Sequence, residues 1–302
     1  MVGAKGFEPS TLWSQTRCAT RLRYAPTPCI LTASLTEAVW VRTIFDFHTA
    51  STFSMSNQRP LPWLEPGDPF PDIAQAWAAD SDAAGLLAAG GCLDVASLVR
   101  AYSHGIFPWY SQGQPILWWS TDPRMVLEVS RFKLHRSLKK TIQRFRADVR
   151  CEIRFDTAFN AVIDSCAHAE RNGQGGTWIV PEMVAAYQAL HQAGHAHSVE
   201  TWVGGELAGG LYCVNIGKAI FGESMFAQRT DASKLALAAL VCFCRAQGLD
   251  FIDCQQNTAH LSSLGASEMP RTRFAVQVKS AIALESPEWR FDALYWQHLL
   301  DT

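Results

Sequence analysis

Three polar residues in the last third of the chain have types and spacing that suit a functional site. Glu223 and Asp253 each stand at or near the carboxyl end of a predicted apolar strand, where α/β sheets place ligand-binding groups. Gln255 follows Asp253 by two residues, so both side chains leave the strand on the same face. A carboxylate and an amide can therefore share one site. The alternative is a structural carboxylate whose charge a fixed partner satisfies.

Two other groups of reactive residues give weaker signals. The histidine-rich run 191–197 has a spacing that suggests metal ligands, but Gly194 should end a helix inside it and no acidic or cysteine ligand accompanies it. Cys254 and His260 could act as nucleophile and base, but nothing in the sequence places them together. We therefore expect no metal site.

Capping residues and glycines at regular intervals predict the helices and strands that must position these groups. Asp231 or Ser233 can cap an apolar helix that Gly248 ends, and a buried strand follows at 249–255. Strands in succession, then a helix and another strand, predict an α/β (α+β) fold with a mixed sheet. The preceding strands form a predicted meander with Gly-containing turns, at 198–203, 206–215 and 219–226.

Further helices and short strands are predicted upstream. Asp94 can cap a helix over 95–104, and Asp156 can cap one that runs to Cys166. Pro181 can open a third helix. Aromatic, Pro-bounded runs between 105 and 120 suit short strands, and their rings have two interpretations, core packing or a stacking surface for a base.

Segment 131–150 carries the clearest electrostatic signal. Eight basic side chains against one acid give +7, in a chain whose formal net charge is −2. Apolar residues recur there at helical spacing, which predicts an amphipathic helix with a basic outer face. A face of one sign favours phosphate contacts over an ordinary solvated surface. The candidate contacts are Arg131, Lys133, Arg136, Lys139, Lys140 and Arg144.

Composition sets the broad class. A chain of 302 residues with 48% hydrophobic and 18% charged residues is typical of a globular protein with a sizeable core. The near-neutral net charge means that a nucleic-acid partner must bind a local patch. Nine scattered cysteines give no disulfide framework, so we expect reduced thiols and a cytoplasmic location.

Residues 1–54 differ from the rest of the chain. Their longest apolar run, 31–45, is interrupted by two charges and cannot span a membrane, and a transit peptide is one interpretation. Residues 6–9 and 23–26 can instead be back-translated to tRNA-gene sequence. This predicts a reading frame extended upstream, with the start at Met55 and a spurious or disordered extension before it.

Short motifs along the chain together resemble one family. Over residues 61–274 they resemble the bacterial leucyl/phenylalanyl-tRNA protein transferase family, and residues 1–54 have no counterpart in its pattern. The motifs are GIFPWY (105–110), ILWWS (116–120), DPR (122–124), GTWI (176–179), GHAHSVE (194–200), FGESMF (221–226), ASK (232–234), IDCQ (252–255) and SLGA (263–266).

The resemblance implies a two-domain architecture. A small N-terminal domain, 55–125, precedes a domain of acyl-CoA N-acyltransferase-like fold, 126–302, with a mixed, largely antiparallel sheet. The pyrophosphate loop of that fold is missing, because the nearest match, 245–250, lacks the final small residue. We therefore expect no coenzyme A and no other cofactor, with aminoacyl-tRNA supplying the activated acyl group.

The resemblance also implies an activity. Leu or Phe, and weakly Met, would pass from aminoacyl-tRNA to the free α-amine of proteins that begin with Arg or Lys, which marks them for N-end-rule degradation, with no membrane partner. Asp253 and Gln255 would orient the amine and accept its proton, and Glu223 would hold the positively charged acceptor end or the donor's amine. Which carboxylate contacts which group stays open. Substrate-binding residues would be Trp109 and Trp178 at the aminoacyl-adenosine, and Leu211, Met225, Leu237 and Ile252 around the acyl side chain.

Two other functional classes remain open. A coenzyme A-dependent N-acetyltransferase would share the fold but needs the missing loop. A non-catalytic tRNA-binding module would keep the basic helix and the tryptophans, but gives no reason for Glu223, Asp253 and Gln255 to lie together.

Overall fold

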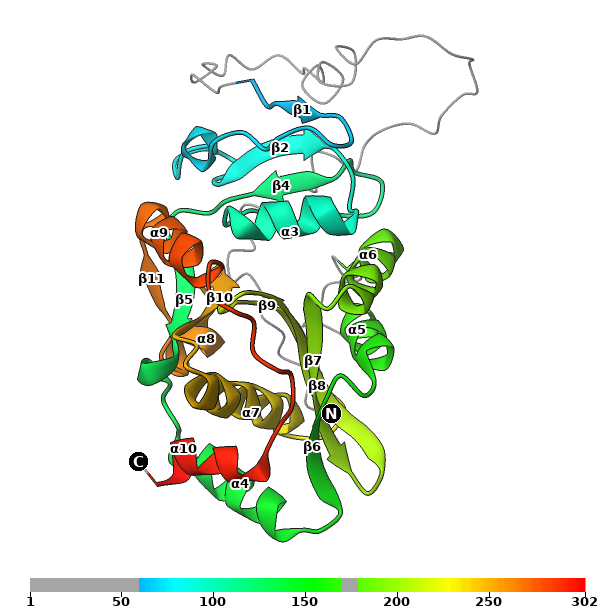
Figure 1. Cartoon of the computed structure of the whole chain (residues 1–302), viewed down its shortest axis with the longest axis vertical. Helices are drawn as coiled ribbons and strands as arrows, with labels where there is room; N and C mark the ends of the chain where they lie inside the picture. Colours follow the sequence, from blue (N-terminus) through cyan, green and yellow to red (C-terminus); the bar gives the residue numbers. More distant parts are fainter. Residues whose placement is uncertain (1–59, 170–178, 302) are drawn as a thin grey trace, which may run out of the picture.

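The computed structural model of this chain describes residues 60–169 and 179–301. The predicted extension 1–54, the predicted start at Met55 and the candidate ligand-binding Trp178 lie outside the described residues. Figure 1 shows a small sheet at one end of the molecule, above a larger sheet with helices on both faces. The predicted α/β class, with a small N-terminal region and a C-terminal domain, is confirmed. The N-acyltransferase-like assignment and the domain boundaries stay predictions.

The N-terminal region contains a four-stranded sheet and one α-helix. Helix α3, Val95–Ser103, begins as predicted, since the Asp94 carboxylate accepts the Ser97 N–H at 2.7 Å. The aromatic runs form two of the short strands, as expected. The strand order is β1-β2-β4-β3, with bounds Trp63–Leu64, Leu86–Gly90, Leu117–Trp119 and Phe107–Pro108, and the 3-10 helix η1 spans Ile73–Gln75.

The C-terminal domain is built on a seven-stranded sheet. All neighbouring pairs are antiparallel except β9 and β10, which are parallel, so the predicted mixed, largely antiparallel sheet is confirmed. The meander lies close to its predicted bounds. The strand order is β11-β5-β10-β9-β8-β7-β6, with β5 Arg124–Glu128, β6 Cys151–Phe155, β7 Ala196–Val203, β8 Glu206–Ile216, β9 Ala219–Ala227, β10 Phe251–Gln255 and β11 Ser267–Met269.

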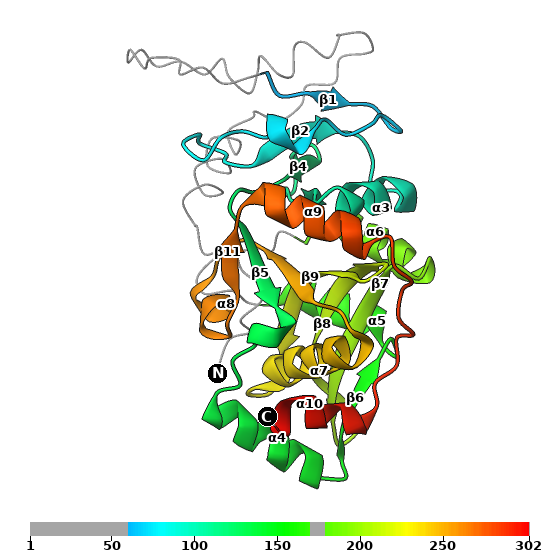
Figure 2. The same ribbon diagram turned by 60° about the vertical axis from the view of Figure 1, so that its left-hand side comes forward.

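Different helices cover the two faces of this sheet (Figures 1 and 2). On one face lies α7, Ala232–Gln247, whose side chains are buried over most of its length, with α4, Arg136–Ala147, and α10, Gln297–Leu300, beside it. On the other face lie α5, Phe159–His168, and α6, Pro181–Gln192, and α6 also contacts α3. Two separate hydrophobic clusters result, one on each face. The remaining helices are η2 Val129–Arg131, α8 Ala259–Ser263, α9 Arg271–Ala281 and η3 Ala293–Trp296.

Two of the predicted caps are wrong. Helix α5 begins only at Phe159, and the Asp156 carboxylate instead accepts the backbone N–H of Ser198 at 2.8 Å and contacts the His197 ring at 2.7 Å. Asp231 occupies the N-cap position of α7 but makes no capping bond, because its carboxylate binds the Lys234 ammonium at 2.6 Å. In both places a partner outside the helix backbone competes for the carboxylate.

The basic α-helix is shorter than the basic segment 131–150 in the sequence. Only 136–147 is α-helical, so the candidate tRNA contact Arg131 lies in the 3-10 helix η2 and Lys133 lies in the turn that follows. The expected apolar stripe is present, with Leu138, Ile142 and Phe145 buried. None of the helices in the described ranges is long and apolar enough to cross a membrane.

Candidate active site

The parallel strands β9 and β10 stay paired over a very short stretch. Ile252 pairs with Ile220 and Asp253 pairs with Phe221, and Glu223 lies just beyond this pairing. Glu223 is the extra residue of a bulge, because Tyr212 and Cys213 of β8 pair with Ser224 and Gly222 on either side of it. Such a bulge changes the direction in which its side chain points.

A second irregularity lies opposite, in β10. The register against β5 shifts between Asp253 and Gln255, and Gln255 has a left-handed φ of 54°. The Gln255 amide then donates to a Glu223 carboxylate oxygen at 3.4 Å. The structure thus brings together Glu223, Asp253 and Gln255, as the sequence predicted.

Two tyrosine hydroxyl groups donate hydrogen bonds to the Glu223 carboxylate. Tyr102 from α3 donates to one carboxylate oxygen at 2.8 Å, and Tyr187 from α6 donates to the other at 3.1 Å, while the two hydroxyls also contact each other. Glu223 is 5% exposed. Burial raises the pKa of Glu223 to about 7, against the lowering effect of the tyrosine hydrogen bonds, and the nearby Asp253 charge raises it further.

A cation neutralises Asp253. The guanidinium of Arg124 binds both carboxylate oxygens, at 2.8 and 2.6 Å, and neither side chain is exposed to solvent. The same carboxylate also accepts the backbone N–H of Gln255 at 3.0 Å. Arg124 is enclosed in turn, with its guanidinium 4.7 Å from the ring centres of both Phe107 and Phe274.

The sequence analysis did not single out the three residues that bind these carboxylates, which are Arg124, Tyr102 and Tyr187. Arg124 belongs to the DPR motif and opens an apolar strand, so a buried cation next to a predicted acidic site was a usable signal. Tyr102 and Tyr187 gave none, because a tyrosine on an apolar helix face is ordinary core.

Of the two candidate tryptophans, Trp109 is described. Its ring is 4% exposed and packs edge-on against Trp119 at 5.4 Å, and its carbonyl accepts the Trp119 indole N–H at 2.6 Å. The Trp109 indole N–H is buried without an acceptor among the described residues. The role of Trp109 at the aminoacyl-adenosine stays a prediction.

The candidate acyl-pocket residues lie on the other face of the sheet. They are at most 1% exposed and belong to the cluster around α7, whereas Tyr102 and Tyr187, the partners of Glu223, belong to the opposite cluster. The structure does not bring these residues next to the carboxylates, and their role stays a prediction. They are Leu211, Met225, Leu237 and Ile252.

The basic candidates divide into free and engaged groups. Arg136, Lys140 and Arg144 are exposed on α4, at the end of the molecule away from the small sheet (Figure 1), without an ionic partner in the described ranges. Lys139 donates to the carbonyl of Leu300 at 2.9 Å. Arg131 pairs with Glu128 at 2.7 Å, and Lys133 is exposed beside it, with its backbone N–H bonded to Leu264.

The weaker candidates have structural contacts. The rings of His191 and His197 stack on Phe159 and Trp289, at 4.2 and 4.0 Å. Within 60–169 and 179–301, no group of three or more His, Cys, Asp or Glu side chains is arranged to hold a metal ion. Cys254 lies in the cluster around α7, and burial raises the pKa of its thiol, which opposes formation of a nucleophilic thiolate.

Known proteins match the chain over nearly all of the described part. Sequence profiles described as leucyl/phenylalanyl-tRNA protein transferase and as its N-terminal domain match residues 126–279 and 91–122. Relatives named leucyl/phenylalanyl-tRNA--protein transferase include one from Polaromonas sp., 59% identical over 80% of this chain and 95% of its own length, and one from Albidiferax ferrireducens, 61% identical over 82% and 97%. The relative from Leptothrix cholodnii is 59% identical over 80% and 96%.

Similarity to solved structures is much weaker. L-PGS from Bacillus licheniformis shares 10% identity and a TM-score of 0.31, over 55% of this chain and 50% of that one, which is too low to support a fold assignment. The sequence matches are sufficient by themselves, because they cover both regions that surround the carboxylate cluster. This chain belongs to the leucyl/phenylalanyl-tRNA protein transferase family.

Proposed function

We propose that this chain transfers Leu or Phe, and weakly Met, from aminoacyl-tRNA to the free α-amine of proteins that begin with Arg or Lys. Family membership supports the reaction class. The structural observation that carries the proposal is the cluster of Glu223, Asp253 and Gln255 where β9 and β10 separate. The reaction takes place in the cytoplasm and marks the acceptor for N-end-rule degradation.

The reaction sets a clear chemical demand on this cluster. The acceptor amine attacks the ester carbonyl carbon, a peptide bond forms, and the bond to the ribose oxygen of the terminal adenosine breaks. The amine, with an ordinary pKa near 8, gives up a proton, and the leaving ribose oxygen takes one. A group that exchanges protons near neutral pH is therefore needed beside the ester.

Glu223 meets this demand better than Asp253. Its pKa of about 7 leaves it able to take up a proton at the pH where the amine reacts. Protonation of Asp253 would leave the buried Arg124 guanidinium without its counter-ion, at a cost of about 3 to 5 kcal/mol. Asp253 instead holds the Gln255 backbone, and the Gln255 amide orients the amine beside Glu223.

The body of the donor tRNA binds away from this cluster, on the basic face of α4. Arg136, Lys140 and Arg144 contact phosphates, which gives binding that depends on salt more than on tRNA sequence. Trp109 and Trp178 hold the terminal adenosine, with the free indole N–H of Trp109 as a donor. Leu211, Met225, Leu237 and Ile252, on the opposite face of the sheet, stay the candidate lining for the acyl side chain. Coenzyme A takes no part.

A transfer assay tests this proposal. Labelled Leu-tRNA is offered to a peptide that begins with Arg and to the same peptide with its α-amine acetylated. We expect the wild type to label only the free peptide, and Glu223→Gln to lower kcat/KM about a hundredfold or more. Glu285→Gln, on an exposed residue after α9, is the matched control and should behave as the wild type.

Two results would contradict different parts of the proposal. Bound tRNA without labelling of either peptide would leave a binding module and no transferase. Full activity of Glu223→Gln would keep the transferase but remove Glu223 as the proton acceptor.

A further inference from the structure

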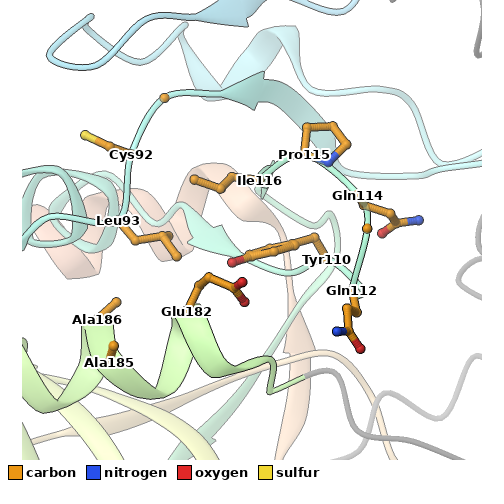
Figure 3. A pocket seen from close by; sticks show the side chains of 12 residues that line it. Cys92, Leu93, Tyr110, Gln112, Gln114, Pro115, Ile116, Glu182, Ala185 and Ala186 are labelled. Carbon is orange, nitrogen blue, oxygen red and sulfur yellow. The ribbon is translucent and has the colours of Figure 1, made fainter. Parts of the chain in front are cut away.

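A cavity of about 690 Å³ opens between the N-terminal region and α6, and the mechanism above does not use it (Figure 3). Three segments form its walls: the turn before α3, the loop between β3 and β4, and the first two turns of α6. The lining residues are Gly91, Cys92, Leu93, Tyr110, Gln112, Gly113, Gln114, Pro115, Ile116, Glu182, Ala185 and Ala186.

The polar groups of this cavity are suited to a cation. Glu182 is the only charged residue that lines it in the part of the chain that the structure describes, and it is exposed. The Tyr110 side chain is 6% exposed, its hydroxyl points into the cavity beside Glu182 (Figure 3), and no acceptor binds this hydroxyl among the described residues. Burial and the Glu182 charge raise the pKa of Tyr110 to about 12, so the hydroxyl stays neutral.

The remaining lining is neutral, with the amides of Gln112 and Gln114 on one side and apolar side chains elsewhere. Leu93, Pro115, Ile116 and Ala185 contribute carbon surface around the carboxylate. Such a site, with an apolar wall and one negative group, matches a side chain that has an aliphatic stem and a positively charged end. A phosphate-bearing ligand fits poorly, because no Lys or Arg lines the cavity among residues 60–169 and 179–301.

The same turn of α6 contributes to the cavity and to the carboxylate cluster. Ala186 lines the cavity and precedes Tyr187, whose hydroxyl binds Glu223. Tyr110 likewise follows Trp109. Glu223 itself has little capacity left for a further cation, because it is 5% exposed and already binds two hydroxyls and an amide.

We propose that this cavity binds the side chain of the acceptor's N-terminal Arg or Lys, with Glu182 pairing the positive charge and the apolar walls holding the stem. This inference rests on the proposed function. It assigns selection of the acceptor to Glu182 and leaves proton transfer to Glu223, which are separate tasks on separate residues.

The test compares peptides that begin with Arg or with citrulline, which has the same shape without the charge. We expect the wild type to prefer Arg about tenfold or more in kcat/KM, as a charge-assisted contact would give. Glu182→Gln should lose most of this preference while its KM for Leu-tRNA stays unchanged. Glu285→Gln should keep the wild-type preference.

A second variant tests the cavity without removing charge. Ala185→Leu narrows the cavity from an exposed position on α6, so it should raise the KM for the Arg peptide severalfold and leave that for Leu-tRNA unchanged. An active Glu182→Gln that keeps the Arg preference would overturn this inference and leave the proposed function intact. A wild type that labels no peptide would overturn both.

Discussion

Glu223 and Asp253 lie on neighbouring strands and are both buried, but the side chains that bind them differ in charge. Asp253 faces a guanidinium that is itself enclosed, so the two side chains form a buried ion pair. Glu223 faces two hydroxyls and an amide, which favour its ionised form less strongly than a cation does. The comparison teaches that two buried carboxylates can be held in different ways, because one faces a cation and the other faces hydroxyls and an amide.

The largest expected effect comes from removing the Arg124 cation that pairs with Asp253. Arg124→Met should lower the free energy of unfolding by about 3 to 5 kcal/mol, because it leaves the buried Asp253 unpaired. Urea denaturation measures this change. Arg131→Met, whose pair with Glu128 is largely exposed, should cost about 0 to 1 kcal/mol.

A double variant makes this prediction sharper. Adding Asp253→Asn to Arg124→Met removes the uncompensated charge and should recover part of the lost stability. An Arg124→Met protein within 1 kcal/mol of the wild type would show that Asp253 does not depend on this cation.

The pH dependence of stability gives the next largest effect. The folded pKa of Glu223, about 7, exceeds its ordinary value of 4.5, so the folded state holds the proton more tightly. The wild type should therefore lose about 3 kcal/mol of stability as pH rises from about 4.5 to 7, and no more above this range.

Glu223→Gln isolates this contribution, because every other titrating group is common to both proteins. The stability difference between the variant and the wild type should grow in favour of the variant across that pH range. The groups that act on Glu223 are Tyr102, Tyr187, Asp253 and Arg124. A difference that does not change with pH would mean that Glu223 has an ordinary pKa.

Removal of one hydroxyl should have a smaller effect. Tyr102→Phe and Tyr187→Phe each delete a bond that lowers the pKa of Glu223. The pH of half-maximal kcat/KM should move upward, and the rate at pH 7 should fall severalfold, about 1 kcal/mol, and recover at higher pH. Tyr295→Phe, which loses only a bond to Gln247 on the α7 face, should keep the wild-type profile.

Substitutions on the basic face of α4 should change tRNA binding without affecting the carboxylate cluster. They have the smallest expected effect. Lys140→Ala and Arg144→Ala should each weaken tRNA binding a few-fold and reduce the slope of log K against log salt by about 0.7 to 0.9. Peptide KM and the pH profile should stay as in the wild type. Lys279→Ala on α9 is the control, and an equal loss in that variant would refute a specific contact by α4.

Local signals in the sequence predicted much of the fold. Gly-containing turns separate the meander strands, and Asp94 caps α3 through a neighbour three residues away, so short windows were sufficient. The error at Asp156 has the opposite cause. Its partner Ser198 lies 42 residues further along, and cap preference contains no information about such a competitor.

The sequence predicted the carboxylates of the candidate site but not the side chains that bind them. The two-residue spacing of Asp253 and Gln255 placed them together without any knowledge of the sheet. Arg124 is 129 residues from Asp253, and Tyr102 is 121 residues from Glu223. Such pairs depend on strand order and on the β9 bulge, neither of which leaves a pattern in one sequence.

The enclosed guanidinium has a consequence for how this protein can be divided or recombined. Phe107 belongs to the small sheet, Arg124 and Asp253 to the large one, and Phe274 to α9, so each part supplies a wall that the others need. A fragment cut between the two regions would remove Phe107 and uncover one side of the Arg124 guanidinium. Chimeras between relatives should keep these four residues from a single parent, since the small sheet, the large sheet and α9 together enclose this ion pair.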